Sequence, residues 1–270
     1  MQILKILLAA TLVWAYGGIG HSLSGRVAQE LLSPEATALV KKLLPKQKGQ
    51  LKDVASWADE IKGNKKYDWA KPLHYINPVN DDPPRLCTYS GIPQDCPNDV
   101  CVVAAIHNFT NRLIHSNDKE EALKFLVHFI GDIHQPLHQR IRSDFKNNPD
   151  TYAQFIVKQI GTTWRAEVPE WLTCPEVTPA LTFQNDQMNF NCLDGNCQRT
   201  NELENLVCPE IWAKYANQIN CDVTFRGYKR RANLPADYYK VSIEVEEKML
   251  AQAGVRMAAI LDEIAKVVKL

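Results

Sequence analysis

The sequence lacks a long apolar run, a net charge and any alternating apolar–polar pattern of strand length. No segment has the roughly eighteen consecutive apolar residues of a membrane-spanning helix. Lysines plus arginines equal aspartates plus glutamates at 31 each. The chain therefore lacks the basic excess with which many proteins bind phosphates, and any phosphate contact must be local, for instance through metal ions.

Apolar residues recur at three- and four-residue steps, which predicts an all-α fold. The expected helices are 36–44, 54–61, 100–114, 120–133, 151–163 and a long final helix over 243–267. Ser33 and Pro34 give the first of these an N-cap and a proline at its first position. We find no internal repeat and no low-complexity tract.

Two stretches interrupt this pattern. Residues 76–99 are rich in proline and are predicted to form a loop. Residues 174–208 are rich in Asn, Asp and Cys and contain too few apolar residues for a core of their own. We interpret the second stretch as a disulfide-held insertion, so that residues 16–270 form a single domain.

The first fifteen residues are typical of a signal peptide. Lys5 precedes a short apolar run, and the small residues Val13 and Ala15 predict cleavage after Ala15. The eight cysteines then favour disulfides, with free buried thiols as the alternative. Asn108 begins an Asn-Phe-Thr glycosylation sequon. We expect a protein that is secreted or resides in the lumen of a secretory or lytic compartment.

All seven histidines lie within residues 21–138. Residues 122–133 are apolar on nearly all sides, which predicts a buried helix. Lys124, His128 and Asp132 follow one another at four-residue steps and share one stripe of it. A buried His and Asp need partners, because an unpaired buried polar group costs about 1–3 kcal/mol. A metal ion between them would satisfy both, and a simple hydrogen bond in the core is the alternative.

The histidines beyond this helix differ in their surroundings. Pro136 should end the helix and turn the chain so that His138 faces back toward it. His134, near the end of the helix, is predicted to be exposed rather than a ligand. His107 and His115 are predicted to be surface or packing residues of the preceding helix.

Three further candidates precede the loop. Asp59 ends an apolar motif, and His74 is flanked by apolar residues, so that a structural role is the ordinary interpretation of each. His21 follows glycine-rich residues 17–20, which we expect to be flexible. Zinc prefers histidine nitrogen and carboxylate oxygen, and hydrolytic zinc sites keep a position open for water. Three histidines and two aspartates near apolar walls are suggestive of such a site.

Four motifs occur in order: YGGIGH at 16–21, SWAD at 56–59, LHYI at 73–76 and FLVHFIGDIHQPLH at 125–138. Together they resemble the S1/P1 nuclease family, fungal and plant zinc enzymes related to bacterial zinc phospholipase C. The last motif is long and specific. The resemblance is good over 16–138, poor over 139–209 and moderate from Trp212 onward. It implies an all-α fold with three zinc ions in a cleft.

The resemblance also implies ligand sets. The first zinc would be held by Asp59, His74, His128 and Asp132. A neighbouring zinc would be held by His21, Asp132 and the amino group and carbonyl of the mature first residue, here Tyr16, where the family usually has Trp. The third zinc would use His138, but we do not find the downstream glycine-rich stretch that supplies its other two ligands in the family. We therefore expect two zinc ions in this chain.

In the family, zinc-activated water attacks phosphorus and gives 5′-nucleotides. The resemblance then implies that Asp59 orients the water and that Lys62 neutralises phosphate charge. Tyr75 would stack on a base, which favours single strands. Asn77 stands where fungal members carry Asp, so base contacts would differ. The alternatives are a merely solvated Lys62 and a Tyr75 in the core.

The predicted function is a secreted zinc-dependent endonuclease of single-stranded DNA or RNA, impaired by the loss of third-zinc ligands. We expect a monomer with no stable protein partner and no membrane attachment. One alternative is a non-catalytic, zinc-binding secreted protein that keeps the fold. Another is a phospholipase C-like hydrolase, against which the SWAD motif and the disulfide pattern argue.

Disulfide pairings follow from the same resemblance. Its pattern implies Cys87–Cys221 and Cys96–Cys101. The other four cysteines are extra to the family pattern, and we pair them as Cys192–Cys197 and Cys174–Cys208.

Overall fold

The computed structural model describes residues 17–79, 86–135, 148–174, 203, 206–226 and 236–268. Its elements in chain order are α1 Gly17–Leu31, α2 Pro34–Leu43, η1 Leu51–Asp53, α3 Trp57–Glu60, η2 Ile61–Gly63, η3 Lys65–His74, η4 Pro97–Asp99, α4 Val102–His115, α5 Lys119–Ile133, α6 Pro149–Gly161, α7 Val168–Trp171, α9 Pro209–Ile219, η6 Asn220–Thr224 and α10 Ala236–Val267. The described chain is helical and has no strand, which confirms the predicted all-α fold. None of its helices is long and apolar enough to cross a membrane.

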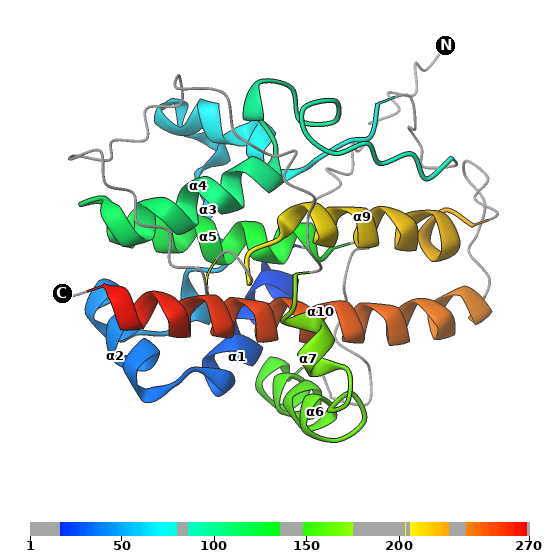
Figure 1. The fold of residues 1–270 in the computed structure, drawn as a ribbon. Coiled ribbons are helices and arrows are strands. Elements are labelled where there is room, and N and C mark those ends of the chain that lie inside the picture. The colour runs from blue at the N-terminus through cyan, green and yellow to red at the C-terminus, as the bar shows by residue number, and fades with distance from the viewer. Residues whose placement is uncertain are drawn as a thin grey trace, which may run out of the picture.

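Helix α10 runs across the whole molecule, with α4, α5 and α9 on one side of it and α2 and α6 on the other (Figure 1). It packs along α1 and also contacts α2, α5, α6 and α7. Helix α5 packs against α4 and contacts α1, α3 and α9. Between Ala122 and Ile133, only Lys124 and Asp132 are not fully buried, as the apolar pattern of this helix predicted. The long helix α10 and the buried helix α5 therefore form the frame of the fold.

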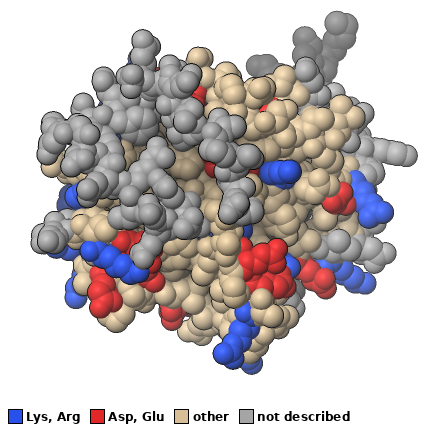
Figure 2. Space-filling model, viewed as in Figure 1, with Lys and Arg blue, Asp and Glu red and all other residues tan. Residues whose placement is uncertain are grey.

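Surface charge is mixed. Acidic and basic side chains are interspersed on the face shown in Figure 2, and neither sign forms a broad field among the residues drawn in colour. Lys124, which shares a stripe with His128, pairs with Glu120 at 2.6 Å and lies over the ring of Trp57. The charge pattern thus agrees with the sequence, in which no basic excess is available for phosphate binding.

Local sequence explains how α2 begins. The side chain of Ser33 accepts a hydrogen bond from the backbone N–H of Ala36, and Pro34 occupies the first turn. The backbone N–H of Ser33 in turn donates to Asp262 of α10 at 2.9 Å. The predicted N-cap is therefore confirmed, and it also ties the start of α2 to the final helix.

Two predictions about local structure are wrong. Residues 54–61 were expected to form one helix, but only Trp57–Glu60 is α-helical, flanked by 3₁₀ turns. The carbonyl of Ala55 instead accepts a hydrogen bond from the ring of His128, so tertiary structure uses a group that a longer helix would need. Residues 17–20 were expected to be flexible, but they begin α1. Packing of α1 against α10, α6 and α5 outweighs the cost of glycine in a helix.

The described residues contain three disulfides, two of which join parts of the chain far apart in sequence. Cys87 pairs with Cys221, Cys96 with Cys101, and Cys174 with Cys208, as expected from the sequence. The expected partners Cys192 and Cys197 lie outside the described residues, as do the predicted signal peptide and most of the predicted 174–208 insertion. The Cys174–Cys208 bond links the segment after α7 to the start of α9.

Candidate metal centre

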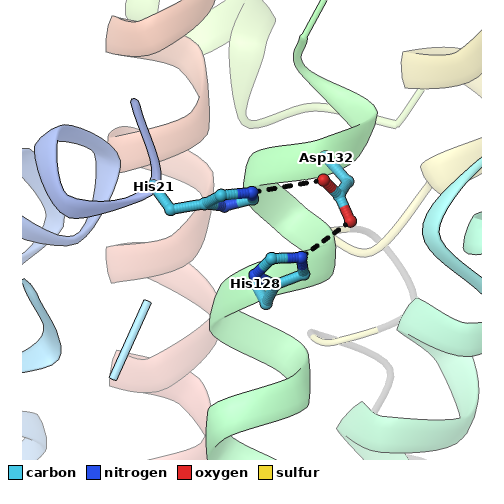
Figure 3. Close-up of side chains that lie close together, drawn as sticks. All are labelled: His21, His128 and Asp132. Carbon is cyan, nitrogen blue, oxygen red and sulfur yellow. Dashed lines mark ion pairs between the residues drawn. The ribbon is translucent and has the colours of Figure 1, made fainter. Parts of the chain in front are cut away.

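Five candidate ligand side chains, separated by more than a hundred residues of sequence, converge on one point of the fold. His21 comes from α1, Asp59 from α3, His74 from the end of η3, and His128 and Asp132 from one stripe of α5. His21 and His128 reach Asp132 from two different helices (Figure 3). All five side chains are 7% exposed or less.

The two oxygens of Asp132 face different histidines. Oδ2 lies 2.9 Å from Nδ1 of His74 and 3.1 Å from Nε2 of His128. Oδ1 lies 3.3 Å from Nε2 of His21. A carboxylate placed in this way can serve two neighbouring cations at once, one through each oxygen.

Asp59 closes the other side of this cluster. Its Oδ1 lies 3.5 Å from Nε2 of His128 and 3.7 Å from Nδ1 of His74. Its Oδ2 lies 3.8 Å from Nε2 of His21. Two groups of possible ligand atoms result, His21 with His128 and Asp132, and Asp59 with His74 and His128. Within each group the atoms all lie within 4.8 Å of one another.

A hydrogen bond to a group outside the cluster orients the ring of His128. Nδ1 of His128 lies 2.7 Å from the carbonyl oxygen of Ala55, to which an Nδ1–H donates. Nε2 of His128 then points at the carboxylates, the orientation that a ligand histidine takes when its other nitrogen is bound to the protein. Nε2 of His74 is buried and has no hydrogen-bond partner among the described residues. Such an atom costs free energy unless something binds it. Three imidazoles and two carboxylates are the donors that zinc prefers, so the residues of the cluster fit a metal ion.

Burial and neighbouring charges shift the pKa values of the side chains in this cluster. Burial and the charge of His128 lower the pKa of His21 to about 4, so this ring is neutral at pH 7. Although burial opposes the shift, Asp132 and Asp59 raise the pKa of His128 to about 9. Burial would raise the pKa of Asp59, but hydrogen bonds with His128 and Lys62 lower it to about 2. The carboxylates of Asp59 and Asp132 thus stabilise a positive charge within the cluster. That charge is a proton on His128 or, in its place, a metal cation.

Of the three predicted substrate-side residues, Lys62 contacts this cluster. Nζ of Lys62 is 2.5 Å from Oδ1 of Asp59, and this side chain is 40% exposed, so it is more than a solvated surface charge. Tyr75 is 53% exposed, which excludes the alternative that it belongs to the core. Asn77 is also exposed.

The predicted ligands Tyr16 and His138 lie outside the described residues. The sequon residue Asn108 lies within helix α4 and is half-buried, and the threonine of the sequon is 7% exposed. His107 faces Glu210 at 2.9 Å, and His115 is exposed at the end of α4, as predicted for surface or packing residues.

The prediction that His134 is exposed is wrong. This side chain is 1% exposed and lies between the carbonyl oxygen of Ile130 and the guanidinium of Arg256. The reason is tertiary, because α10 brings Arg256 to the end of α5. Sequence analysis also missed Gly131, whose lack of a side chain makes room for His21. A glycine inside a strongly apolar helix was the only signal for it.

Buried histidines and aspartates that converge from four helical elements define a helical protein with a candidate binuclear metal centre. The model of the S1/P1 nuclease family matches residues 16–266, so the chain belongs to this family.

Curated relatives match over nearly their whole length. The chain is 33% identical to Endonuclease 4 of Arabidopsis thaliana over 287 residues, 97% of this chain and 92% of the relative. It is 30% identical to Nuclease S1 of Aspergillus oryzae, covering 95% of this chain and 94% of the relative. Identity to Nuclease P1 of Penicillium citrinum is 29%, over 92% and 97% of the two chains.

Proposed function

We propose that this protein is a zinc-dependent endonuclease that hydrolyses the phosphodiester bonds of single-stranded DNA or RNA to 5′-nucleotides. The observation that carries the proposal is the placement of Asp132, whose two oxygens face His21 on one side and His74 and His128 on the other. Membership of a nuclease family supports the same activity.

The ligand assignment rests on these contacts and on membership of the family. One zinc would be held by Asp59, His74, His128 and Asp132. The second would be held by His21, Asp132 and the amino group and carbonyl of Tyr16. When bound, zinc ions of this kind lower the pKa of water and neutralise phosphate charge. The amino-group ligand requires cleavage after Ala15, so this proposal includes removal of a signal peptide and secretion.

Residues of the chain itself bind and orient the substrate. Asp59 is buried and ionised, so it can accept a hydrogen bond from the attacking water. The ammonium of Lys62 lies beside it and is accessible, so it can attract a phosphate as a point charge. The exposed ring of Tyr75 offers a face for base stacking, which a single strand can use and a paired base cannot. Asn77 would contact the same base.

We further propose that the third zinc site is incomplete and that the enzyme is slow. His138 has no later histidine to share a zinc ion with. The alignment with Endonuclease 4 spans 287 positions, more than the 270 residues of this chain, so that the relative has residues without a counterpart here. The same observation favours a second candidate, a non-catalytic zinc-binding protein that keeps the fold.

A cleavage assay separates the two candidates. The processed chain, with zinc bound, is incubated with single-stranded DNA, single-stranded RNA and double-stranded DNA of equal length. We expect slow cleavage of the single strands to products with 5′-phosphates, abolished by a chelator and restored by zinc. Asp59→Asn is the inactive control. Zinc binding without cleavage of any substrate would favour the non-catalytic candidate, and cleavage that survives removal of zinc would contradict both.

A further inference from the structure

A buried pair of side chains, Arg256 and His134, holds the end of α5. Arg256 lies in α10, and His134 directly follows the last residue of α5. Nη1 of Arg256 lies 2.6 Å from Nε2 of His134. The two residues are 8% and 1% exposed, and neither belongs to the ligand groups described above.

The proton on His134 can be placed from its partners. A guanidinium has only N–H donors, so Nε2 of His134 accepts and carries no proton. Nδ1 therefore carries the proton of the neutral ring and donates to the carbonyl oxygen of Ile130, 2.7 Å away. Both ring nitrogens are thus bound to protein atoms, and neither is left to bind a metal ion.

Arg256 joins α5 to two further helices. Its Nε donates to the carbonyl oxygen of Trp171 in α7 at 3.0 Å. Its guanidinium lies 5.0 Å from the ring of Trp212 in α9, and the ring of His134 lies 5.3 Å from the same indole. Four helices therefore meet at one buried guanidinium.

The partners of Arg256 do not offset the free energy that it costs to bury a guanidinium. Its hydrogen-bond and ring partners in the described part of the chain are a carbonyl, a neutral imidazole and an indole, and Tyr215 is an electrostatic neighbour; none of these is a carboxylate. A buried charge without a counter-charge costs free energy that a well-packed apolar side chain would not.

The pair acts on the turn that carries Asp132. His134 closes this last turn of α5 twice, because its backbone N–H donates to the carbonyl of Gly131 and its ring donates to that of Ile130. The backbone N–H of Gln135 donates to the carbonyl of Asp132 itself at 3.1 Å. Any rotation of the His134 ring would therefore loosen the turn that aims the Asp132 carboxylate.

We propose that Arg256 and His134 are a positioning pair for the metal centre, holding the last turn of α5 so that Asp132 presents one oxygen to His21 and the other to His74 and His128. This inference rests on the proposed function, because it needs Asp132 to bind metal ions. The pair touches no substrate and contributes no ligand. Its effect is on the affinity of the centre for zinc and on turnover, not on substrate binding.

Three variants of the full, processed chain test the pair. Arg256→Met keeps length and removes all donors. His134→Asn keeps an N–H near the Nδ1 position and loses the acceptor for Arg256, whereas His134→Gln keeps an acceptor near the Nε2 position. We expect zinc affinity, measured by competition with a chromophoric chelator, to fall about 10–100-fold in the first two. The fall should be smaller in His134→Gln. With zinc saturating, kcat should fall while KM stays unchanged.

Ile260→Ala is the matched control, since Ile260 is fully buried one turn further along α10. It should lower the Tm of the zinc-free protein and leave zinc affinity unchanged. If Arg256→Met also lowers the Tm but binds zinc as tightly as the unaltered chain, the pair is merely structural and the inference is wrong. If the unaltered chain itself binds no zinc, the proposed function fails first, and the inference fails with it.

Discussion

A β-carbon on Gly131 would lie 2.7 Å from Nδ1 of His21 and 3.2 Å from Cε1 of the same ring. The His21 ring therefore lies directly against the backbone of α5, where it also stacks on His128 with ring centroids 3.8 Å apart. Only glycine at position 131 leaves room for the His21 ring, so Gly131 allows His21 of α1 to lie at the site.

Gly131→Ala should separate helix stability from metal binding. Alanine is about 1 kcal/mol better than glycine inside a helix, yet its methyl group must displace His21. We expect loss of the zinc that uses His21 and retention of the other. Elemental analysis measures the zinc content, and circular dichroism measures the stability of the helices. Gly161→Ala is the control, because its β-carbon would meet nothing within 4 Å. Full zinc content in Gly131→Ala would contradict this account of His21.

The number of bound zinc ions tests the incomplete third site. We expect about two tightly bound zinc ions per processed chain, because there are two ligand groups, which share His128, while His138 lacks a later histidine as partner. Elemental analysis after extensive dialysis measures this number. A value of three would show that residues other than those proposed complete the third site.

The free amino group of Tyr16 provides a second test. A form that keeps residues before Tyr16 has an amide there, which does not bind zinc as an amine does. We expect it to lose one zinc ion and its hydrolytic activity, and removal of the extension should restore both. A tag of equal length at the C-terminal end is the control. Full activity of the extended form would exclude the amino group as a ligand.

Asp132→Ala should be the most damaging single change. It removes the carboxylate that faces His21, His74 and His128 and takes from the buried His128 its nearest carboxylate, so we expect the free energy of unfolding to fall by about 1–3 kcal/mol. Activity should fall at least a hundred- to a thousandfold, roughly the loss of one transition-state stabilising element. Asp68→Ala removes the same charge from an exposed site. Comparable losses in both variants would contradict the special role of Asp132.

Glu246 predicts a pH dependence of stability. Burial and the neighbouring Glu247 raise the pKa of Glu246 to about 8, against an ordinary value of 4.5. The folded state thus holds this proton more tightly than the unfolded state does. The tighter binding of this proton adds to the free energy of unfolding. This contribution is fully present below pH 4.5 and is lost as the pH rises through about 8.

Glu246→Gln should abolish this loss, since an amide keeps the neutral form at every pH. We expect it to raise the free energy of unfolding at pH 9 by about 1–3 kcal/mol and to change it little at pH 4.5. Urea unfolding at the two pH values measures the difference. Glu244→Gln removes an equal charge from an exposed position of α10, and an equal gain in that variant would point to net charge instead.

The sequence by itself determined the helical class, most helix positions and the identity of the candidate ligands. Periodicity alone identified the stripe of His128 and Asp132 on a buried helix, because a helix repeats its faces every three to four residues. His21, Asp59 and His74 were named through resemblance of their motifs, since nothing in their local sequence distinguishes a ligand from a structural residue.

Only the tertiary structure shows which oxygen of Asp132 faces which histidine and where His134 lies. It also explains why residue 131 is glycine. The physical reason is that each of these depends on a contact between segments far apart in the chain. Arg256 lies 122 residues beyond His134 and reaches it only because α10 crosses the end of α5. Local helix propensity does not predict a contact between residues so far apart, which depends on how the helices pack.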